Sequence, residues 1–186
     1  MNPMKNKKDL ETTIDEIRNF AHTYLEKYTP SKQQLRIYLF KKLVKKNQKI
    51  SNKKEIFNLI DTVITSLVDN KFLSDKYYSD VKAKDFLRKG YSLNKIRYKL
   101  ITKGIDEKYI KASISKIKEN ESDPDFFSAI KICKRRRIGP SREESNRSLF
   151  YKKDISILAR SGFSYEISKK VLEIPKEEFK KFCKMI

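Results

Sequence analysis

Apolar residues recur along this chain every three to four positions, which is the spacing of one face of an α-helix. Between residues 56 and 68 the apolar stripe consists of Ile56, Leu59, Ile60, Val63, Ile64, Leu67 and Val68. Shorter stripes follow the same rule, as in Leu35, Leu39 and Leu43. Alternating apolar and polar runs, which would indicate strands, are hard to find. The pattern therefore predicts an all-α protein.

Polar residues and glycines divide this pattern into nine main helices in groups of three. The predicted helices cover residues 14–27, 31–45 and 53–70, then 75–89, 92–103 and 106–120, then 124–137, 141–160 and 164–173, and Pro175 opens a short last helix to about residue 184. We expect N-caps at Ser31, Asp75, Ser92, Asp106 and Ser164, at Asp123 before Pro124, and at Ser141 in a capping box with Glu144. The four glycines, Gly90, Gly104, Gly139 and Gly162, are expected between helices, where a positive φ ends a helix without strain.

Two sequence spacings near 60 residues indicate a tandem repeat. The segment from Leu35 to Leu39 returns 61 residues later and ends at Leu100, and the segment from Leu100 to Gly104 returns 58 residues later from Leu158. We therefore expect three helix-turn-helix-like units of three helices each, stacked into an elongated, curved array with one repeated face. The predicted division is a flexible basic tail at 1–12, units at 13–73, 74–122 and 123–174, and the last helix at 175–186, with an insertion at 46–52 in the first unit.

The charge of the chain predicts an anionic partner. Its 186 residues carry 44 Lys and Arg against 24 Asp and Glu, for a net charge of +20. Abundant lysine can reflect an AT-rich genome, but the acidic residues do not compensate for it. A field of this sign attracts polyanions, so nucleic acid, or protein assembled on nucleic acid, is the expected partner rather than a membrane.

The sequence contains no recognisable catalytic or metal-binding set. The single histidine, His22, has no partner residue for base catalysis, so we expect a structural or solvent-facing role. Cys133 and Cys183 lack metal-ligand spacing, and Cys133 is expected to be a small buried residue. We find no glycine-rich phosphate loop, no run of 18 apolar residues and no signal peptide. These observations predict a cytoplasmic protein that is not an enzyme and needs no cofactor or metal.

Arginines gather in one part of this lysine-rich chain. Eight of the ten fall between residues 88 and 160, and three are consecutive at Arg135, Arg136 and Arg137. Guanidinium groups make forked contacts with phosphate or carboxylate that lysine cannot make. Because three consecutive residues cannot share one helix face, we expect at least one of them to pack or pair within the protein. The alternative for this run is a solvated helix end, where cations offset the helix dipole.

Aromatic residues accompany these charges. We expect the phenylalanines Phe86, Phe126, Phe127 and Phe163 to pack in the core. The tyrosines Tyr91, Tyr98 and Tyr151 lie among basic residues and are candidates to contact the partner.

Three motifs in this order resemble the RecX family of recombinase modulators. They are the run from Leu87 to Ile105 around Gly90 and Gly104, the segment Leu73 to Tyr78, and the segment Leu158 to Ile167 with Gly162 and Phe163. The resemblance covers about residues 15 to 174. The basic run from Lys134 to Pro140 and the insertion in the first unit depart from the family pattern.

The resemblance implies an all-helical, curved protein that lies in the groove of the RecA–single-stranded DNA filament, and we expect the protein to be a monomer. Such a protein would bridge RecA subunits and damp recombinase, ATPase and co-protease activity. The residues expected to bind the filament or its DNA are Arg88, Lys89, Arg97, Lys99, Lys103, Lys134, Arg135, Arg136, Arg137, Arg142, Arg147 and Arg160. Among them we expect Arg88, Arg97, Lys103, Arg142, Arg147 and Arg160 to be largely exposed.

Two other classes of function fit part of the sequence. A helical DNA-binding protein or transcription regulator that acts alone could use helix pairs of the repeat as helix-turn-helix units. No isolated recognition helix rich in Asn, Gln and Arg supports this alternative. A basic RNA- or ribosome-associated protein would have a similar charge but would not be expected to have an ordered repeat.

Overall fold

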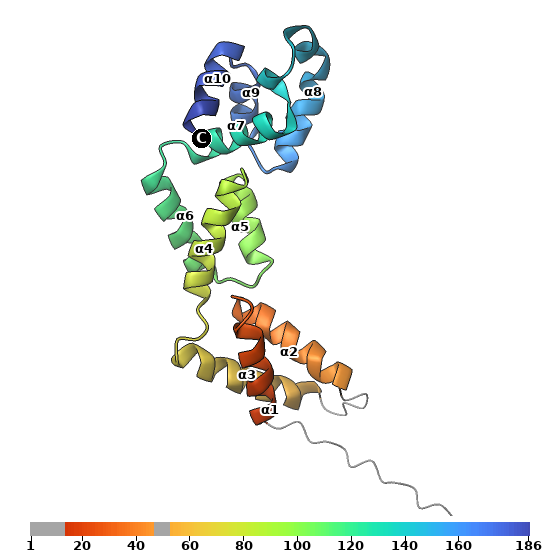
Figure 1. Cartoon of the computed structure of the whole chain (residues 1–186), viewed down its shortest axis with the longest axis vertical. Coiled ribbons are helices and arrows are strands. Elements are labelled where there is room, and N and C mark those ends of the chain that lie inside the picture. Colours follow the sequence, from red (N-terminus) through yellow and green to blue (C-terminus); the bar gives the residue numbers. More distant parts are fainter. Residues whose placement is uncertain (1–13, 47–52) are drawn as a thin grey trace, which may run out of the picture. The chain divides into compact units, whose positions relative to one another are not determined.

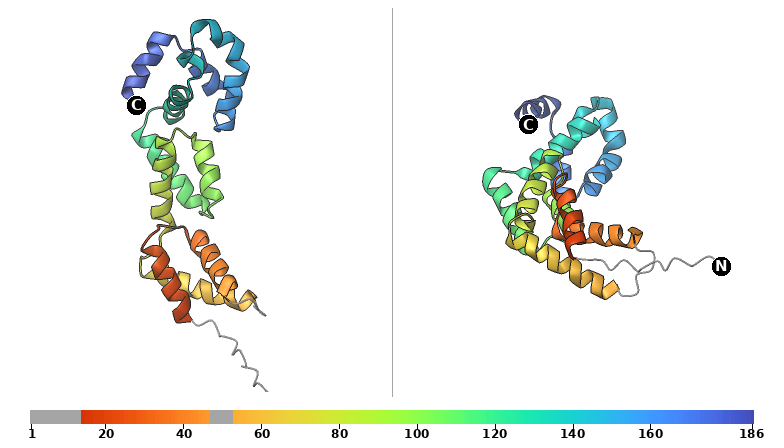
Figure 2. Two further views of the ribbon diagram at one scale, coloured as in Figure 1. Left: turned by 45° about the vertical axis from the view of Figure 1, so that its right-hand side comes forward. Right: turned by 60° about the horizontal axis from the view of Figure 1, so that its bottom comes forward.

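A computed structural model describes residues 14–46 and 53–186, and every regular element in these ranges is helical. Figures 1 and 2 show the helices and the turns that join them. The prediction of an all-α fold is confirmed. The elements are α1 (Ile14–Leu25), α2 (Lys32–Lys46), α3 (Lys53–Asp69), α4 (Asp75–Arg88), α5 (Leu93–Ile101), α6 (Glu107–Asn120), α7 (Pro124–Arg136), the 3₁₀ turn η1 (Gly139–Ser141), α8 (Glu144–Arg160), α9 (Tyr165–Leu172) and α10 (Lys176–Met185).

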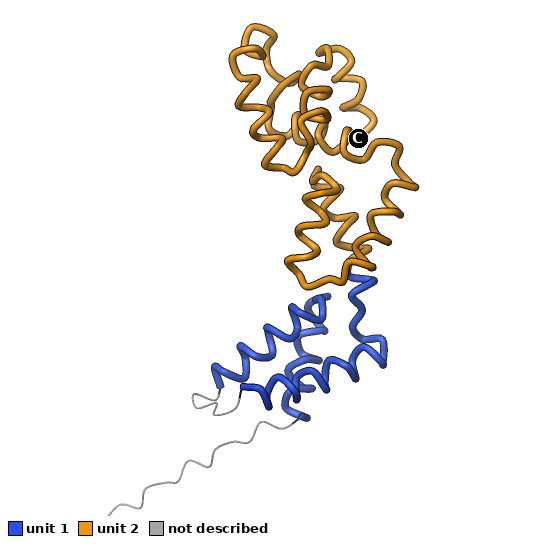
Figure 3. The backbone as a smooth tube through the Cα atoms, turned by 180° about the vertical axis from the view of Figure 1, so that it is seen from behind, with its two compact units in different colours: residues 1–78 blue, residues 79–186 orange. Residues whose placement is uncertain are grey.

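The contacts divide the chain into two compact units, residues 1–78 and 79–186 (Figure 3). In the first unit, α1, α2 and α3 enclose a core built on the fully buried Ile17, Leu35, Leu39, Leu43 and Ile60. Burying one such side chain stabilises the fold by about 1.5–3 kcal/mol. The order of the helices fits three groups of three, although the three-unit division and the elongated array stay predictions. The predicted tail at 1–12 and most of the predicted insertion at 46–52 lie outside the described residues.

The second unit contains α5 and α6 as one packed pair, and α7 to α10 around a separate core. That core includes Ala129, Ile130, Cys133, Leu158 and Val171, each fully buried. The repeated positions Leu39, Leu100 and Leu158 are all 0% exposed, as the sequence spacing predicts. Each lies on the middle helix of its predicted group.

Most of the predicted helix starts are confirmed by side-chain caps. Ser92 Oγ accepts a hydrogen bond from Lys95 N at 3.1 Å, and Asp106 Oδ1 accepts one from Lys108 N at 2.9 Å. Ser31 forms a reciprocal pair with Gln34, in which each backbone N–H donates to the other side chain. The side chains of Ser164 and Asp123 cap α9 and α7 by accepting from the backbone N–H groups of Ile167 and Phe126.

Two predicted caps are wrong. Asp75 is the first residue of α4, and Ser74 Oγ instead accepts from Tyr77 N at 3.2 Å. Ser141 does not begin a helix, because it belongs to η1 and its hydroxyl donates to the carbonyl of Cys133 at 3.1 Å. Helix α8 therefore begins at Glu144, three residues later than predicted.

All four glycines have a positive φ, between 54° and 90°, as predicted, and Gly90, Gly104 and Gly162 follow the ends of helices, whereas Gly139 begins η1. Helix α7 differs, since its C-cap is Arg137, which itself adopts a left-handed conformation with φ 52°. At Gly104 and Gly162 the same pair of hydrogen bonds closes the helix: Ile105 N and Phe163 N donate back to Leu100 O and Leu158 O. The 58-residue spacing thus repeats a helix end as well as a buried leucine.

Candidate functional site

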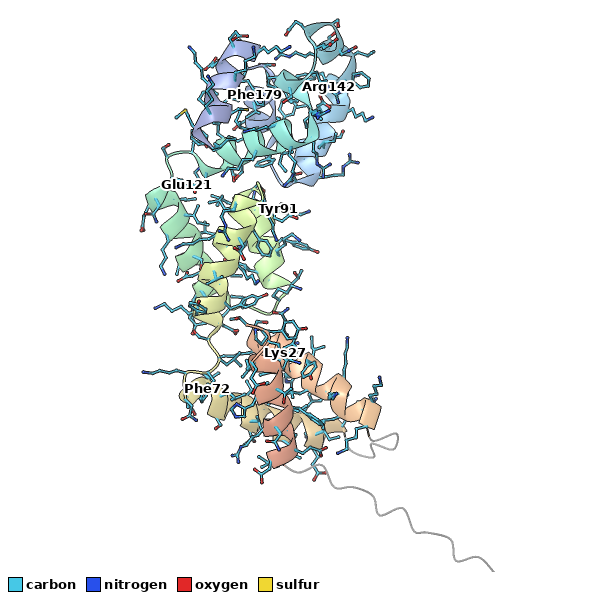
Figure 4. All side chains as sticks on the ribbon, in the orientation of Figure 1. Lys27, Phe72, Tyr91, Glu121, Arg142 and Phe179 are labelled. Carbon is cyan, nitrogen blue, oxygen red and sulfur yellow. The ribbon has the colours of Figure 1, made fainter. Side chains whose placement is uncertain are left out.

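The turn from Lys89 to Ser92, between α4 and α5, lies against α7, and Arg135 of α7 reaches it. We call residues 89–92 the junction turn; Tyr91, labelled in Figure 4, lies in it. Gly90 adopts a φ of +78°, and a Cβ at this position would lie 3.1 Å from Ser128 O and 3.2 Å from Lys131 Cβ. Only a glycine lets the junction turn approach α7 this closely without displacing backbone atoms.

Four hydrogen bonds hold the junction turn and the start of α5 against α7 and the end of α8. Arg135 Nη1 donates to Lys89 O at 2.9 Å, and the amide of Leu93 donates to Asp125 Oδ1 at 2.7 Å. Ser92 Oγ donates to Ser161 O at 3.2 Å. Lys95 Nζ donates to Arg160 O at 3.1 Å. Arg135 and Lys95 thus donate hydrogen bonds to carbonyls at the C-terminal ends of α4 and α8, where the helix dipole favours cations.

The predicted binding residues fall into two groups, according to whether their side chains have partners within the protein. Four of them are exposed and form no side-chain hydrogen bond or ion pair with any residue in the described ranges: Lys89, Arg136, Arg137 and Arg160. Their charge remains available to an outside anion. We call these four residues the open cations.

The other predicted residues have partners within the protein. Arg88 pairs with Asp85, whose pKa is lowered mainly by that hydrogen bond. Arg97 Nη2 lies 2.9 Å from Glu107 Oε1, and Lys134 Nζ donates to Cys183 O at 3.0 Å. Lys99 lies over the rings of Phe86 and Tyr91, and Lys103 is half-buried. Arg88 and Arg97 are exposed as predicted, yet their charges are shared with neighbouring carboxylates.

The prediction that Lys103, Arg142 and Arg147 are largely exposed is wrong, because all three are half-buried. Arg142, which lies between η1 and α8 (Figure 4), forms a two-point ion pair with Asp154, whose side chain is 1% exposed. The guanidinium of Arg147 donates to Leu172 O at 2.7 Å and to Ile174 O at 2.9 Å, and its side chain is only 16% exposed. Both arginines hold the third helical group together, so they are poor candidates for contact with a partner.

Two further basic residues lie at the site, although they were not among the residues predicted from the sequence. Lys131 precedes Arg135 by one helical turn and lies beside Gly90. Lys95 precedes Lys99 by one turn and reaches Arg160. Their spacing from two predicted residues placed them on the same helix faces, and this signal could have identified them.

The three candidate tyrosines differ in exposure. Tyr98 is 64% exposed, whereas Tyr91 and Tyr151 are half-buried. The hydroxyl of Tyr151 donates to Glu173 Oε1 at 3.3 Å. Tyr98 is therefore the candidate whose ring is most available to a partner.

The residues considered for catalysis, His22 and Cys133, differ in their burial. His22 is exposed and meets the ring of Phe72 edge-on at 5.7 Å. Cys133 is fully buried as predicted, and burial, the largest cause, raises the pKa of its thiol to about 12. Within residues 14–46 and 53–186 no three His, Cys, Asp or Glu side chains are grouped to hold a metal ion. None of the helices in the same ranges has the length and apolarity to cross a bilayer.

Comparisons with known proteins agree with the resemblance seen in the motifs. The chain is 29% identical over 160 residues to a protein named Regulatory protein RecX from Myxococcus xanthus, covering 84% of each chain. It is 27% identical over 161 residues to the protein of the same name from Agrobacterium fabrum, covering 87% of this chain and 84% of that one. No protein-family model matches the chain.

Solved structures show the same fold. The crystal structure of RecX from Lactobacillus salivarius superposes with a TM-score of 0.60 at 17% identity, covering 90% of this chain and 97% of that one. A second crystal structure, titled regulatory protein RecX, gives a TM-score of 0.59 and covers 87% of this chain and 74% of that one. Motifs, sequence relatives and fold therefore agree, and the chain is similar to RecX regulatory proteins over most of its length.

Proposed function

We propose that this protein binds the filament that RecA forms on single-stranded DNA and limits the recombinase, ATPase and co-protease activities of that filament. In this proposal it acts in the cytoplasm, as a monomer and by occupancy alone, without catalysing a reaction. The similarity to proteins named Regulatory protein RecX supports a regulatory role, and the resemblance of the motifs to the RecX family supplies RecA as the target.

The observation that carries the proposal is the group of open cations around the junction turn. Lys89, Arg136, Arg137 and Arg160 come from three different helix ends, yet the hydrogen bonds of Arg135 and Lys95 hold those ends together. Like charges gathered this way repel one another unless an anion lies between them. DNA phosphates, or the acidic side chains of a protein coating DNA, would supply that anion.

The test compares two variants that lose the same charge. The junction variant replaces Lys89, Arg136, Arg137 and Arg160 with glutamine. The control variant replaces four other exposed lysines of the second unit, Lys111, Lys118, Lys169 and Lys176, with glutamine. RecA ATPase is measured on single-stranded DNA with increasing amounts of each protein.

We expect the wild-type protein and the control variant to reduce ATP hydrolysis by RecA, and the junction variant to have lost most of this effect. Equal inhibition by both variants would mean that the open cations are not the binding surface. If the wild-type protein bound bare DNA as tightly as the filament and left RecA activity unchanged, a DNA-binding protein that acts alone would be the better description.

A further inference from the structure

The outer face of α5 carries apolar side chains that the fold does not use. Ile96 and Leu100 fill the core side of this helix and are fully buried. Tyr98 and Ile101 lie one turn apart on the helix and are 64% and 49% exposed. Because the buried residues already supply the packing of α5, the exposed pair is free to contact another molecule.

The cations of α5 are engaged within the protein. Lys95 donates to Arg160 O, Arg97 pairs with Glu107, and Lys99 lies over two aromatic rings. Helix α5 contains no acidic residue. Its surface is therefore apolar at Tyr98 and Ile101 with fixed positive charge around them. The outer face of α5 therefore differs from the helix ends that carry the open cations, where no such exposed apolar residues lie beside the charges.

Part of this arrangement occurs in the first unit at the equivalent sequence positions. Ile37 on α2 precedes Tyr98 by 61 residues and is 44% exposed. Arg36, the counterpart of Arg97, donates to both carboxylate oxygens of Asp61 at 2.6 and 2.8 Å. An exposed apolar residue beside an arginine that is paired with the third helix of its group therefore occurs twice.

We propose that Tyr98 and Ile101 form a protein-binding surface, whose partner presents an apolar recess within an acidic surface. This inference rests on the proposed function, under which the partner is a RecA subunit and the open cations face the DNA. Tyrosine and arginine are the residues most enriched at the energetic centres of protein interfaces. Stacking on DNA bases requires aromatic rings, and Ile101 and Ile37 cannot supply it.

The matched pair Tyr98 and Tyr165 makes a sharp test, because both tyrosines are helical, belong to the second unit and are 64% exposed. The variants are Tyr98→Ala, Ile101→Ser and the control Tyr165→Ala. Each is titrated by fluorescence anisotropy against a labelled single-stranded oligonucleotide, once bare and once coated with RecA from the same organism. Circular dichroism checks that each variant keeps the helicity of the wild type.

We expect Tyr98→Ala and Ile101→Ser to weaken binding to the RecA-coated oligonucleotide about tenfold and to leave binding to the bare oligonucleotide unchanged. The Tyr165→Ala control should match the wild type in both measurements. An equal loss on bare and coated DNA would assign Tyr98 to base stacking and overturn the inference, as would a Tyr98→Ala variant that behaves like the control. If wild-type protein failed to bind the coated oligonucleotide at all, the proposed function itself would fall.

Discussion

Arg142 and Asp154 form a two-point ion pair in which Nε and Nη2 of the arginine each lie 2.8 Å from a carboxylate oxygen. The carboxylate also accepts a hydrogen bond from the backbone N–H of Gly139 at 2.8 Å, and its side chain is 1% exposed. A buried carboxylate with three donors is tolerated because each donor offsets part of its lost hydration. The pair joins η1 to the middle of α8.

Replacing Arg142 with methionine should therefore lower the free energy of unfolding by about 3–5 kcal/mol, because Asp154 would stay buried with one donor left. The exposed Arg136, changed to methionine, is the control and should alter stability by less than about 0.5 kcal/mol. Urea unfolding followed by circular dichroism measures both. Equal stabilities for the two variants would show that the ion pair contributes nothing.

A second prediction concerns the close approach of Gly162 to α5. Its φ is +90°, and a Cβ there would lie 2.4 Å from Ser92 Oγ and 3.0 Å from Lys95 Cβ. Gly104 has a similar φ of +73° at the equivalent helix end, but a Cβ would meet no crowding atom. Gly104→Ala should cost about 1–2 kcal/mol from backbone strain alone. Gly162→Ala should cost clearly more in the same urea measurement, and identical costs would argue against a tight contact.

Local patterns in the sequence predict the helices and most of their caps, whereas tertiary contacts cannot be predicted from such patterns. The helices follow from the spacing of neighbouring residues, so all ten are found within a few residues of their predicted bounds. The cap at Ser92 was equally local, since its partner lies three residues away. The predicted capping box at Ser141 had the right residues, but the carbonyl of Cys133 takes the serine hydroxyl. A tertiary contact overrode a local preference.

The candidate site was harder to predict for the same reason. Arg147 reads as a surface cation on its helix, and only the fold brings it to the carbonyls of Leu172 and Ile174, 25 and 27 residues away. Sequence composition located the basic region of the chain. It could not distinguish arginines that are bonded within the protein from the open cations, because the bonding partners are distant in the sequence.

A third prediction uses the carboxyl of Asp125, which accepts the amide of Leu93 at 2.7 Å. Burial, the largest cause, raises its pKa above the ordinary value of 3.8 despite that hydrogen bond. The folded protein therefore holds this proton more tightly than the unfolded chain does, and ionising Asp125 costs stability as the pH rises through its native pKa. Asp125→Asn keeps an acceptor for Leu93 without the charge.

We expect the Asn variant to match the wild type below pH 3.8, to become relatively more stable as the pH rises from 3.8 through the native pKa of Asp125, and to keep a constant advantage above it. Asp125→Ala should instead lose about 1–3 kcal/mol at neutral pH, since the Leu93 amide would have no acceptor. Urea unfolding at a series of pH values distinguishes these cases. A relative loss of stability by the Asn variant with rising pH would reverse the expected sign.

The last prediction concerns the salt dependence of binding to bare single-stranded DNA. If the open cations Lys89, Arg136, Arg137 and Arg160 each neutralise a phosphate, replacing all four with glutamine should reduce the slope of log affinity against log salt by about 0.7 per residue, or about three in total. Replacing Lys111, Lys118, Lys169 and Lys176 removes the same charge from elsewhere and should change the slope far less. Anisotropy titrations over a range of salt give both slopes. Long-range attraction depends on the net charge of the protein, whereas the number of released counterions depends on direct contacts with phosphates. Equal changes of slope in the two variants would therefore mean that the field of the whole protein, and not the junction turn, attracts the DNA.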